Sequence, residues 1–141
     1  MLVRLMYASR PISPERADEL AAILKSSRSH NPGAGITGLL CCSSTVFLQV
    51  LEGGRLAVNR LYHRIAADPR HHDLILLGYD EIEERSFVGW AMGQIDLTRL
   101  NTALLLKYSE SPVLDPYAVS GKVSMALFNE LVATASVNCP G

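Results

Sequence analysis

The 141-residue sequence lacks an excess of charge of either sign, since 13 Lys and Arg side chains are balanced by 14 Asp and Glu. Nucleic-acid-binding domains usually carry a clear basic excess, so this balance argues against that class. The chain also lacks an apolar run long enough to cross a membrane, and it does not begin with the basic and apolar regions of a signal peptide. We therefore expect a protein that binds neither nucleic acid nor a membrane.

Cysteine is scarce as well, with only Cys41, Cys42 and Cys139, and no C-x-x-C spacing occurs. An odd count that includes two sequence neighbours argues against a disulfide framework and against a zinc ribbon. His71 and His72 are adjacent, so on an extended segment they point opposite ways, and no further His or Cys stands at ligand spacing. We expect no metal site, and the cysteine usage predicts a reducing, cytoplasmic setting.

Apolar residues, in contrast, make up 48% of the chain, which is enough for one domain with one core. In some segments they alternate with a period of two, and in others they recur at helical spacing. The order of these segments is strand, helix, strand, strand, helix, strand, strand, which indicates a ferredoxin-like α+β fold. We expect a five-stranded mixed sheet with two helices on one face, its strands at 2–7, 36–42, 46–51, 74–79 and 87–95 and its helices at 14–29 and 55–67.

Local residue types set the expected limits of these elements. Ser13 suits the N-cap of the first helix, and Pro14 suits its first position. The Gly pair at 53–54 is expected to end the third strand, and the Asp-Pro pair at 68–69 to end the second helix. The charged stretch 80–85 is interpreted as a solvated connector between the last two strands.

The chain after residue 97 is predicted to hold two helices joined by a loop at 109–120, which contains Pro112 and Pro116. Residues 98–106 fit a short helix, and Val123, Leu127 and Leu131 form the apolar stripe of a last amphipathic helix. Such a stripe must be buried, either on the open face of the sheet or on another subunit. We expect this helix to cover the sheet and to assist formation of a homodimer.

Two polar residues lie where the pattern favours apolar ones. Gln49 lies within a predicted strand whose two faces are equally apolar, so its amide is buried in either register, where an unpaired polar group costs ~1–3 kcal/mol. Tyr7 shares a strand face with Val3 and Leu5, and a buried tyrosine seeks a hydrogen-bond partner. Taken singly, they also fit an edge glutamine bonded to backbone or water and a core tyrosine bonded to a carbonyl.

A glycine-rich motif, three single residues and one charged edge each fit an ordinary structural role as well as a functional one. Residues 33–38 match G-x-G-x-x-G, but they follow a predicted helix and open a strand, so we reject a dinucleotide-binding turn. Asn31 fits an Asx turn, and Trp90 and Met92 fit core packing. A mostly cationic edge fits either a solvated surface or a seat for an anionic diphosphate, and it comprises Arg60, Arg64, Asp68 and His71.

Five segments, taken together and in order, resemble the BLUF family of blue-light sensors that use FAD. The resemblance covers residues 2 to about 96. The segments are Arg4-Leu5-Met6-Tyr7, Asn31 with Gly35-Ile36-Thr37-Gly38-Leu39-Leu40, Phe47-Leu48-Gln49-Val50-Leu51-Glu52-Gly53, Asp68-Pro69-Arg70-His71, and Arg85-Ser86-Phe87-Val88-Gly89-Trp90-Ala91-Met92. The resemblance implies a flavin-binding domain at 1–97 and a helical extension at 98–141, similar to short family members without an effector domain.

The resemblance also implies roles for individual residues. Tyr7 is the expected electron and proton donor to the photoexcited flavin, and Gln49 lies between Tyr7 and the ring. Trp90 and Met92 are expected on the fifth strand beside this pair. The other expected flavin contacts are Asn31 at the polar edge of the ring, His30 where the family often has asparagine, Ile23 and Ile36 packed near the ring, and Arg64, Asp68, Arg70 and His71 around the ribityl and phosphate groups.

An amide offers a donor at one end and an acceptor at the other, so turning or tautomerising Gln49 changes what the flavin receives with little change in shape. The expected function is thus a non-enzymatic FAD photoreceptor whose output passes through a downstream protein partner or through self-association. Two alternatives remain open at this point. They are a small ferredoxin-like hydrolase of acylphosphatase type, for which Arg10 and Asn31 offer no recognisable motif, and a cofactor-free regulatory dimerisation domain.

Overall fold

The sheet of the computed structural model has five strands in the order β4-β1-β3-β2-β5. The structure describes residues 1–30, 35–89 and 92–134, with the side chains of residues 25–30 left aside. All strand pairs are antiparallel except β2 with β5, so the sheet is mixed, as predicted. The strands are β1 (Leu2–Pro11), β2 (Thr37–Cys42), β3 (Phe47–Gly54), β4 (His71–Ile82) and β5 (Gly93–Asp96).

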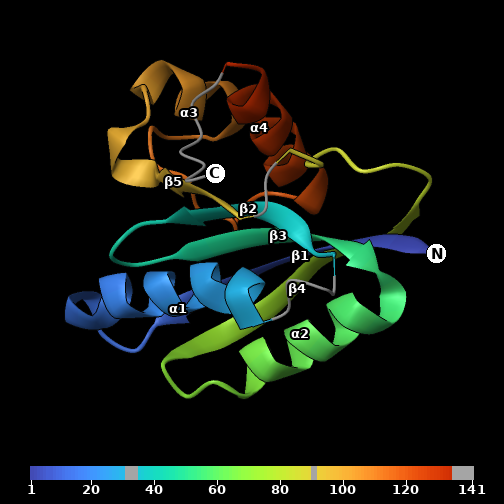
Figure 1. Cartoon of the computed structure of the whole chain (residues 1–141). Coiled ribbons are helices and arrows are strands. Elements are labelled where there is room, and N and C mark those ends of the chain that lie inside the picture. Colours follow the sequence, from blue (N-terminus) through green and yellow to red (C-terminus); the bar gives the residue numbers. More distant parts are fainter. Residues whose placement is uncertain (31–34, 90–91, 135–141) are drawn as a thin grey trace.

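Two helices, α1 (Ala17–His30) and α2 (Arg55–Ala67), cover one face of the sheet, which we call the helix face (Figure 1). A single 3-10 turn over Pro14–Arg16 precedes α1, with Ser13 at the N-cap position but without a side-chain capping bond. The apolar stripes of both helices meet alternate strand residues, because strand side chains alternate between the two faces. The resulting core contains Leu20, Leu24, Val58, Leu61, Ile65 and the strand residues Val3, Leu5, Tyr7, Leu40, Phe47 and Leu51.

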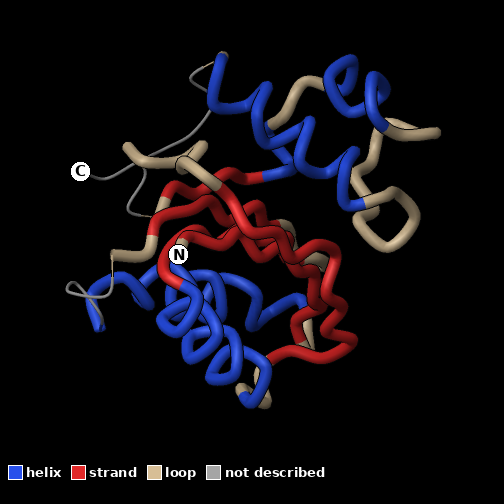
Figure 2. Tube along the Cα trace, turned by 90° about the vertical axis from the view of Figure 1, so that its right-hand side faces the viewer, coloured by secondary structure: helices blue, strands red, loops and turns tan. Residues whose placement is uncertain are grey.

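The last part of the chain covers the opposite face of the sheet, which we call the tail face (Figure 2). It consists of a 3-10 turn (Leu97–Arg99), α3 (Thr102–Tyr108) and α4 (Gly121–Ala133), with Asn101 and Ser120 capping the two helices through their side chains. Leu127 and Leu131 are at most 1% exposed and join a core with sheet residues such as Leu48 and Val50. The prediction that the last helix covers the sheet is confirmed.

The fifth strand was predicted too long. Residues 87–89 are not in a strand, and β5 begins only at Gly93. The reason is that Phe87 belongs to the tail-face core, and its backbone N–H donates to the Glu52 carboxylate rather than to a neighbouring strand (2.8 Å). Met92 lies one residue before β5, and Trp90 lies outside the described residues.

Other limits also differ from prediction: β1 runs to Pro11 rather than ending at residue 7, β4 begins at His71 rather than at residue 74, and α3 begins at Thr102 rather than at residue 98. β3 continues through Gly53 and Gly54, because β1 supplies partners for both of them. β4 runs to Ile82, so the first part of the predicted connector 80–85 is strand paired with β1. Within the described residues, no helix has the length and apolarity needed to cross a membrane.

Candidate functional site

The two polar residues singled out in the sequence are direct partners in the structure. Tyr7 on β1 and Gln49 on β3 are paired in register, and both side chains are fully buried on the helix face. The Tyr7 hydroxyl donates a hydrogen bond to Oε1 of Gln49. Each polar group thus satisfies the other, which explains how both are tolerated inside an apolar core.

The other end of the Gln49 amide faces the segment before β5. Its Nε2 donates to the thioether sulfur of Met92 at 3.4 Å, and Met92 is itself fully buried among the helix-face residues. A thioether is a weak acceptor, whereas an amide nitrogen has two N–H donors. Among the described residues, the amide nitrogen therefore keeps donor capacity for a stronger acceptor.

Tyr62 on α2 is a neighbour that the sequence reasoning missed. Its ring centroid lies 5.6 Å from that of Tyr7, with the two planes tilted by 55°. Burial raises the pKa of Tyr7 well above its ordinary value, and the Tyr62 phenol adds to that shift. The site therefore holds Tyr7 as a neutral phenol whose proton points at Gln49.

The predicted ring contacts are placed only in part. Ile23 on α1 is half-buried, and Ile36, just before β2, packs against the core that contains Tyr7. His30 is the last residue of α1, and its side chain is not described; Asn31 lies outside the described residues.

The predicted phosphate-side residues lie around the end of α2. Asp68 caps the helix and accepts three hydrogen bonds from Arg70, from the backbone N and from Nε and Nη2 of the side chain, at 2.7–2.9 Å. The hydrogen bonds from Arg70 hold the pKa of the Asp68 carboxyl below its ordinary value. Arg64 is exposed in the last turn of α2.

His71 is not on the cationic surface edge suggested by the sequence. It is buried, with Nδ1 at 2.8 Å from the Ser9 hydroxyl and Nε2 at 2.6 Å from the Ile65 carbonyl oxygen. Ser9 is two residues from Tyr7 on the same face of β1. The structure therefore connects His71 to the Tyr7–Gln49 pair through β1, while Asp68 and Arg70 form a separate ion pair nearby in sequence.

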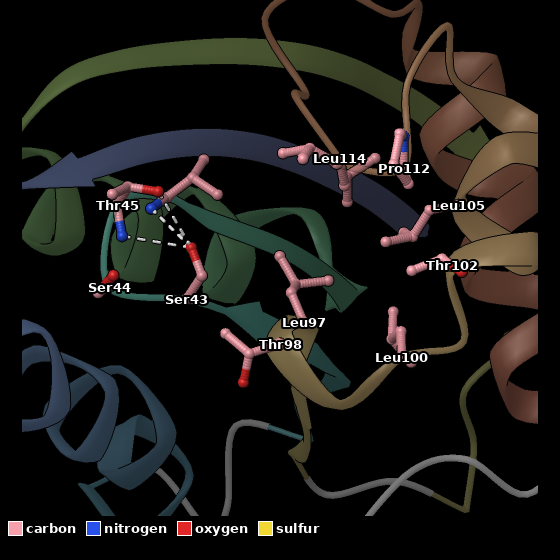
Figure 3. Close-up of a pocket in the computed structure, with 12 residues that line it drawn as sticks. Ser43, Ser44, Thr45, Leu97, Thr98, Leu100, Thr102, Leu105, Pro112 and Leu114 are labelled. Carbon is pink, nitrogen blue, oxygen red and sulfur yellow. Dashed lines mark hydrogen bonds between the residues drawn. The ribbon is translucent and has the colours of Figure 1, made fainter.

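A pocket of about 300 Å³ lies on the other side of the sheet (Figure 3). It lies between the β2–β3 turn, whose Ser43 hydroxyl accepts bonds from the Thr45 and Val46 backbone, and apolar residues that include Leu97, Leu105 and Leu114. None of the predicted site residues that the structure describes is among those that line it. Among the described residues, no group of three His, Cys, Asp or Glu side chains could hold a metal ion.

The family profile described as "BLUF: Sensors of blue-light using FAD" matches residues 2–93. The chain belongs to the BLUF family. Among curated proteins it is similar to the photoactivated adenylate cyclase subunit beta of Euglena gracilis, with 32% identity over 75% of this chain and 13% of that protein. It is also similar to the blue light- and temperature-regulated antirepressor BluF of Escherichia coli, with 30% identity over 69% of this chain and 24% of that protein. The chain thus spans a small part of these relatives.

Solved BLUF structures have the same fold over nearly the whole chain. The photo-activated state of BlsA superposes with a TM-score of 0.79 and 32% identity, covering 94% of this chain and 95% of that one. The dark state of BlrB gives a TM-score of 0.76 and 30% identity, covering 95% and 96%. A BLUF domain is a sensor and not itself an enzyme, and these matches give no support to the acylphosphatase-type hydrolase or the cofactor-free domain.

Proposed function

We propose that this BLUF chain is a blue-light photoreceptor that binds FAD non-covalently on the helix face and signals through a rearrangement of the Gln49 amide. The observation that carries the proposal is the buried hydrogen bond from Tyr7 to Gln49, on paired positions of adjacent strands. Tyr7 is the proposed electron and proton donor. Its raised pKa keeps the proton on the phenol in the dark, so that the proton is available for transfer only after excitation.

The residues on this face suit a flavin. The amide nitrogen of Gln49 has a weak thioether acceptor at 3.4 Å, so a carbonyl or ring nitrogen would be a better partner. Ile23 and Ile36 offer apolar contact, while Arg64, Asp68, Arg70 and His71 are proposed around the ribityl and phosphate groups, and His30 and Asn31 at the polar edge of the ring. When bound, FAD supplies the absorption of blue light and the electron-accepting centre.

The chain itself supplies a hydrogen-bond switch. In the structure the acceptor end of the Gln49 amide faces Tyr7 and its donor end faces Met92. If Tyr7 gives up its proton and later regains it, the amide can settle in a second arrangement that presents a donor where an acceptor stood. Tyr7 must then find a different partner, and Met92 loses its N–H donor. These changes are confined to polar groups that water does not reach.

We propose that the output passes through a downstream protein partner or through a homodimer, in a cytoplasmic setting. The relative named an antirepressor supports a protein partner. The apolar stripe of α4 packs against the sheet of the same chain, so a dimer would need another surface. The edge strand β4 offers the exposed side chains of Ile75, Leu76 and Tyr79. We also retain the division into a flavin-binding region at 1–97 and a helical extension at 98–141.

The test is the visible spectrum of the purified protein. We expect a yellow protein that releases FAD in preference to FMN on denaturation and that shows a reversible red shift of its flavin band under blue light. The Tyr7→Phe variant, purified in parallel, controls for flavin that binds without photochemistry. A colourless protein that does not take up added FAD would refute the proposal.

A further inference from the structure

Three neighbouring strands present a row of polar side chains on the tail face. Arg4 on β1 is paired in register with Glu52 on β3, and Glu52 is paired with Thr37 on β2. Glu52 is fully buried, although it carries a carboxylate. A buried charge is retained only when it is paired and its lone pairs are occupied, so the Glu52 carboxylate needs several hydrogen-bond partners.

The partners of Glu52 come from Arg4 and from the turn after β4. Oε2 accepts from Nε of Arg4 at 2.8 Å and from the backbone N of Ser86 at 3.1 Å, and Oε1 accepts from the backbone N of Phe87 at 2.8 Å. Nη2 of Arg4 lies 2.8 Å from the same carboxylate and also donates to the Ser86 hydroxyl at 2.7 Å. The carboxylate therefore fixes the backbone of two consecutive residues.

The third member of the row holds the residue before them. Nη1 of Arg85 donates to the Thr37 hydroxyl at 3.0 Å. The next side chain, Phe87, packs against Phe128 of α4, with ring centroids 6.1 Å apart in an edge-on arrangement. Residues 85–87 are thus bonded to side chains of β1, β2 and β3, and Phe87 packs against α4.

The same segment ends at the photochemical site. Only four residues separate Phe87, in the tail-face core, from Met92, which contacts Gln49 in the helix-face core. A connection of this length spans at most about 18 Å, so the two contacts lie within that distance of each other. β3 holds both ends, through Glu52 on one face and Gln49 on the other.

We propose that Arg4, Glu52 and Thr37 form a clamp on residues 85–87 that positions Met92 against Gln49 and thereby sets the lifetime of the light-induced state. The inference rests on the proposed function, because it assumes a photocycle at Gln49. Glu52 acts here as a positioning residue: it does not lie on the flavin-binding face and works through the segment that it holds. A carboxylate suits this task because it accepts from two backbone N–H groups and a guanidinium at once.

The test compares Glu52→Gln with Glu81→Gln in the full-length protein. Glu52→Gln keeps the shape of the side chain and removes its charge, while Glu81→Gln removes a surface carboxylate that pairs with Arg55 on exposed positions. We expect both variants to retain flavin. In Glu52→Gln the rate of dark recovery should change by at least about threefold, as for members of one hydrogen-bonded network. In Glu81→Gln it should stay at the parent value.

A second readout needs no photocycle. Trp90 is the only tryptophan of the chain and stands three residues after the clamped residues 85–87 in the sequence. Acrylamide should quench its fluorescence more strongly in Glu52→Gln than in the parent or in Glu81→Gln. If the parent shows no light-induced shift, the proposed function fails, but the quenching comparison still tests the clamp.

Two results would overturn the inference. One is a Glu52→Gln protein whose dark recovery differs from the parent by less than about threefold, and the other is unchanged quenching of Trp90. If Glu52→Gln does not fold, the double variant Thr37→Val, Ser86→Ala removes two side-chain contacts of the clamp without leaving a buried charge unpaired. Dark recovery and acrylamide quenching of Trp90 are then measured in the double variant, and the same threefold criterion applies to dark recovery.

Discussion

Replacing Gln49 by leucine separates the proposed amide switch from mere flavin binding. Leucine has a similar volume but neither donor nor acceptor, so the helix-face core should still pack. The Tyr7 hydroxyl, which is fully buried, loses the acceptor that the structure gives it. Met92 loses only a weak N–H contact at 3.4 Å.

The expected cost in stability follows from those two losses. A buried hydroxyl left without a partner costs about 1–3 kcal/mol, whereas replacing both partners of a buried hydrogen bond by apolar groups is nearly neutral. We therefore expect Gln49→Leu to lower the free energy of unfolding by about 1–3 kcal/mol. The double variant Tyr7→Phe, Gln49→Leu should recover most of that loss, because no orphaned hydroxyl remains.

The optical assay is the light-minus-dark difference spectrum with its dark recovery. Gln49→Leu should bind FAD and show no lasting red-shifted product, since no amide remains to change its arrangement. Gln49→Glu is the finer comparison, because a protonated carboxyl also has a donor and an acceptor end and should keep part of the response. The stability comparison is made by urea unfolding with and without added FAD.

Two results would refute this reasoning. A Gln49→Leu protein with the parent's red-shifted product and recovery rate would show that the amide is not the switch. A double variant that is no more stable than Gln49→Leu alone would show that the hydroxyl of Tyr7 does not depend on Gln49.

Three further outcomes are expected. Tyr7→Phe should keep flavin and fold but lose the photocycle. Because burial raises the pKa of Tyr7 in the folded state, the free energy of unfolding of the parent should fall above pH ~10, by up to about 1.4 kcal/mol per pH unit. The variant should lose stability more gently over the same pH range, as urea unfolding would show. Cutting the chain after Lys107 removes α4 and should cause aggregation in light scattering, while the full-length chain should not aggregate. Gly121→Ala should destabilise by about 1–3 kcal/mol in thermal unfolding, because the added Cβ would lie 2.3 Å from a β4 carbonyl oxygen, whereas Gly54→Ala meets open space.

The sequence was sufficient for the parts of the fold that depend on local pattern. Period-two and helical spacing predicted β1, β2, β3 and both helix-face helices, and the equal apolarity of the two faces of β3 predicted the burial of Gln49. The partnership with Tyr7 followed from the family resemblance and is confirmed by register. Strand pairing made Gly53 and Gly54 part of β3, because a pairing partner outweighs the weak strand preference of glycine.

The sequence misled where neighbouring residues serve different cores. Phe87 and Met92 looked like members of one strand, yet neither lies in a strand, because Phe87 is bonded to Glu52 in the tail-face core and Met92 packs against Gln49 in the helix-face core. Tyr62 matched the apolar stripe of a helix, so nothing in the pattern marked its contact with Tyr7. Glu52 stands at the end of an apolar run, where a charge usually means the edge of the core. Only the three-dimensional neighbours of such residues reveal their roles.

A sheet strand is well suited to connect the two faces of this molecule. Gln49 and Glu52 are three residues apart on β3, which is paired on both sides, so the strand itself has little freedom to move. In the proposed switch, what changes is the segment between Phe87 and Met92. Met92 contacts the Gln49 amide, and Phe87 packs on Phe128 of α4. Coupling between two sites acts equally in both directions. A partner that binds α4 more tightly in one arrangement of Gln49 would therefore favour that arrangement, and the arrangement of Gln49 would change the affinity for the partner by the same factor.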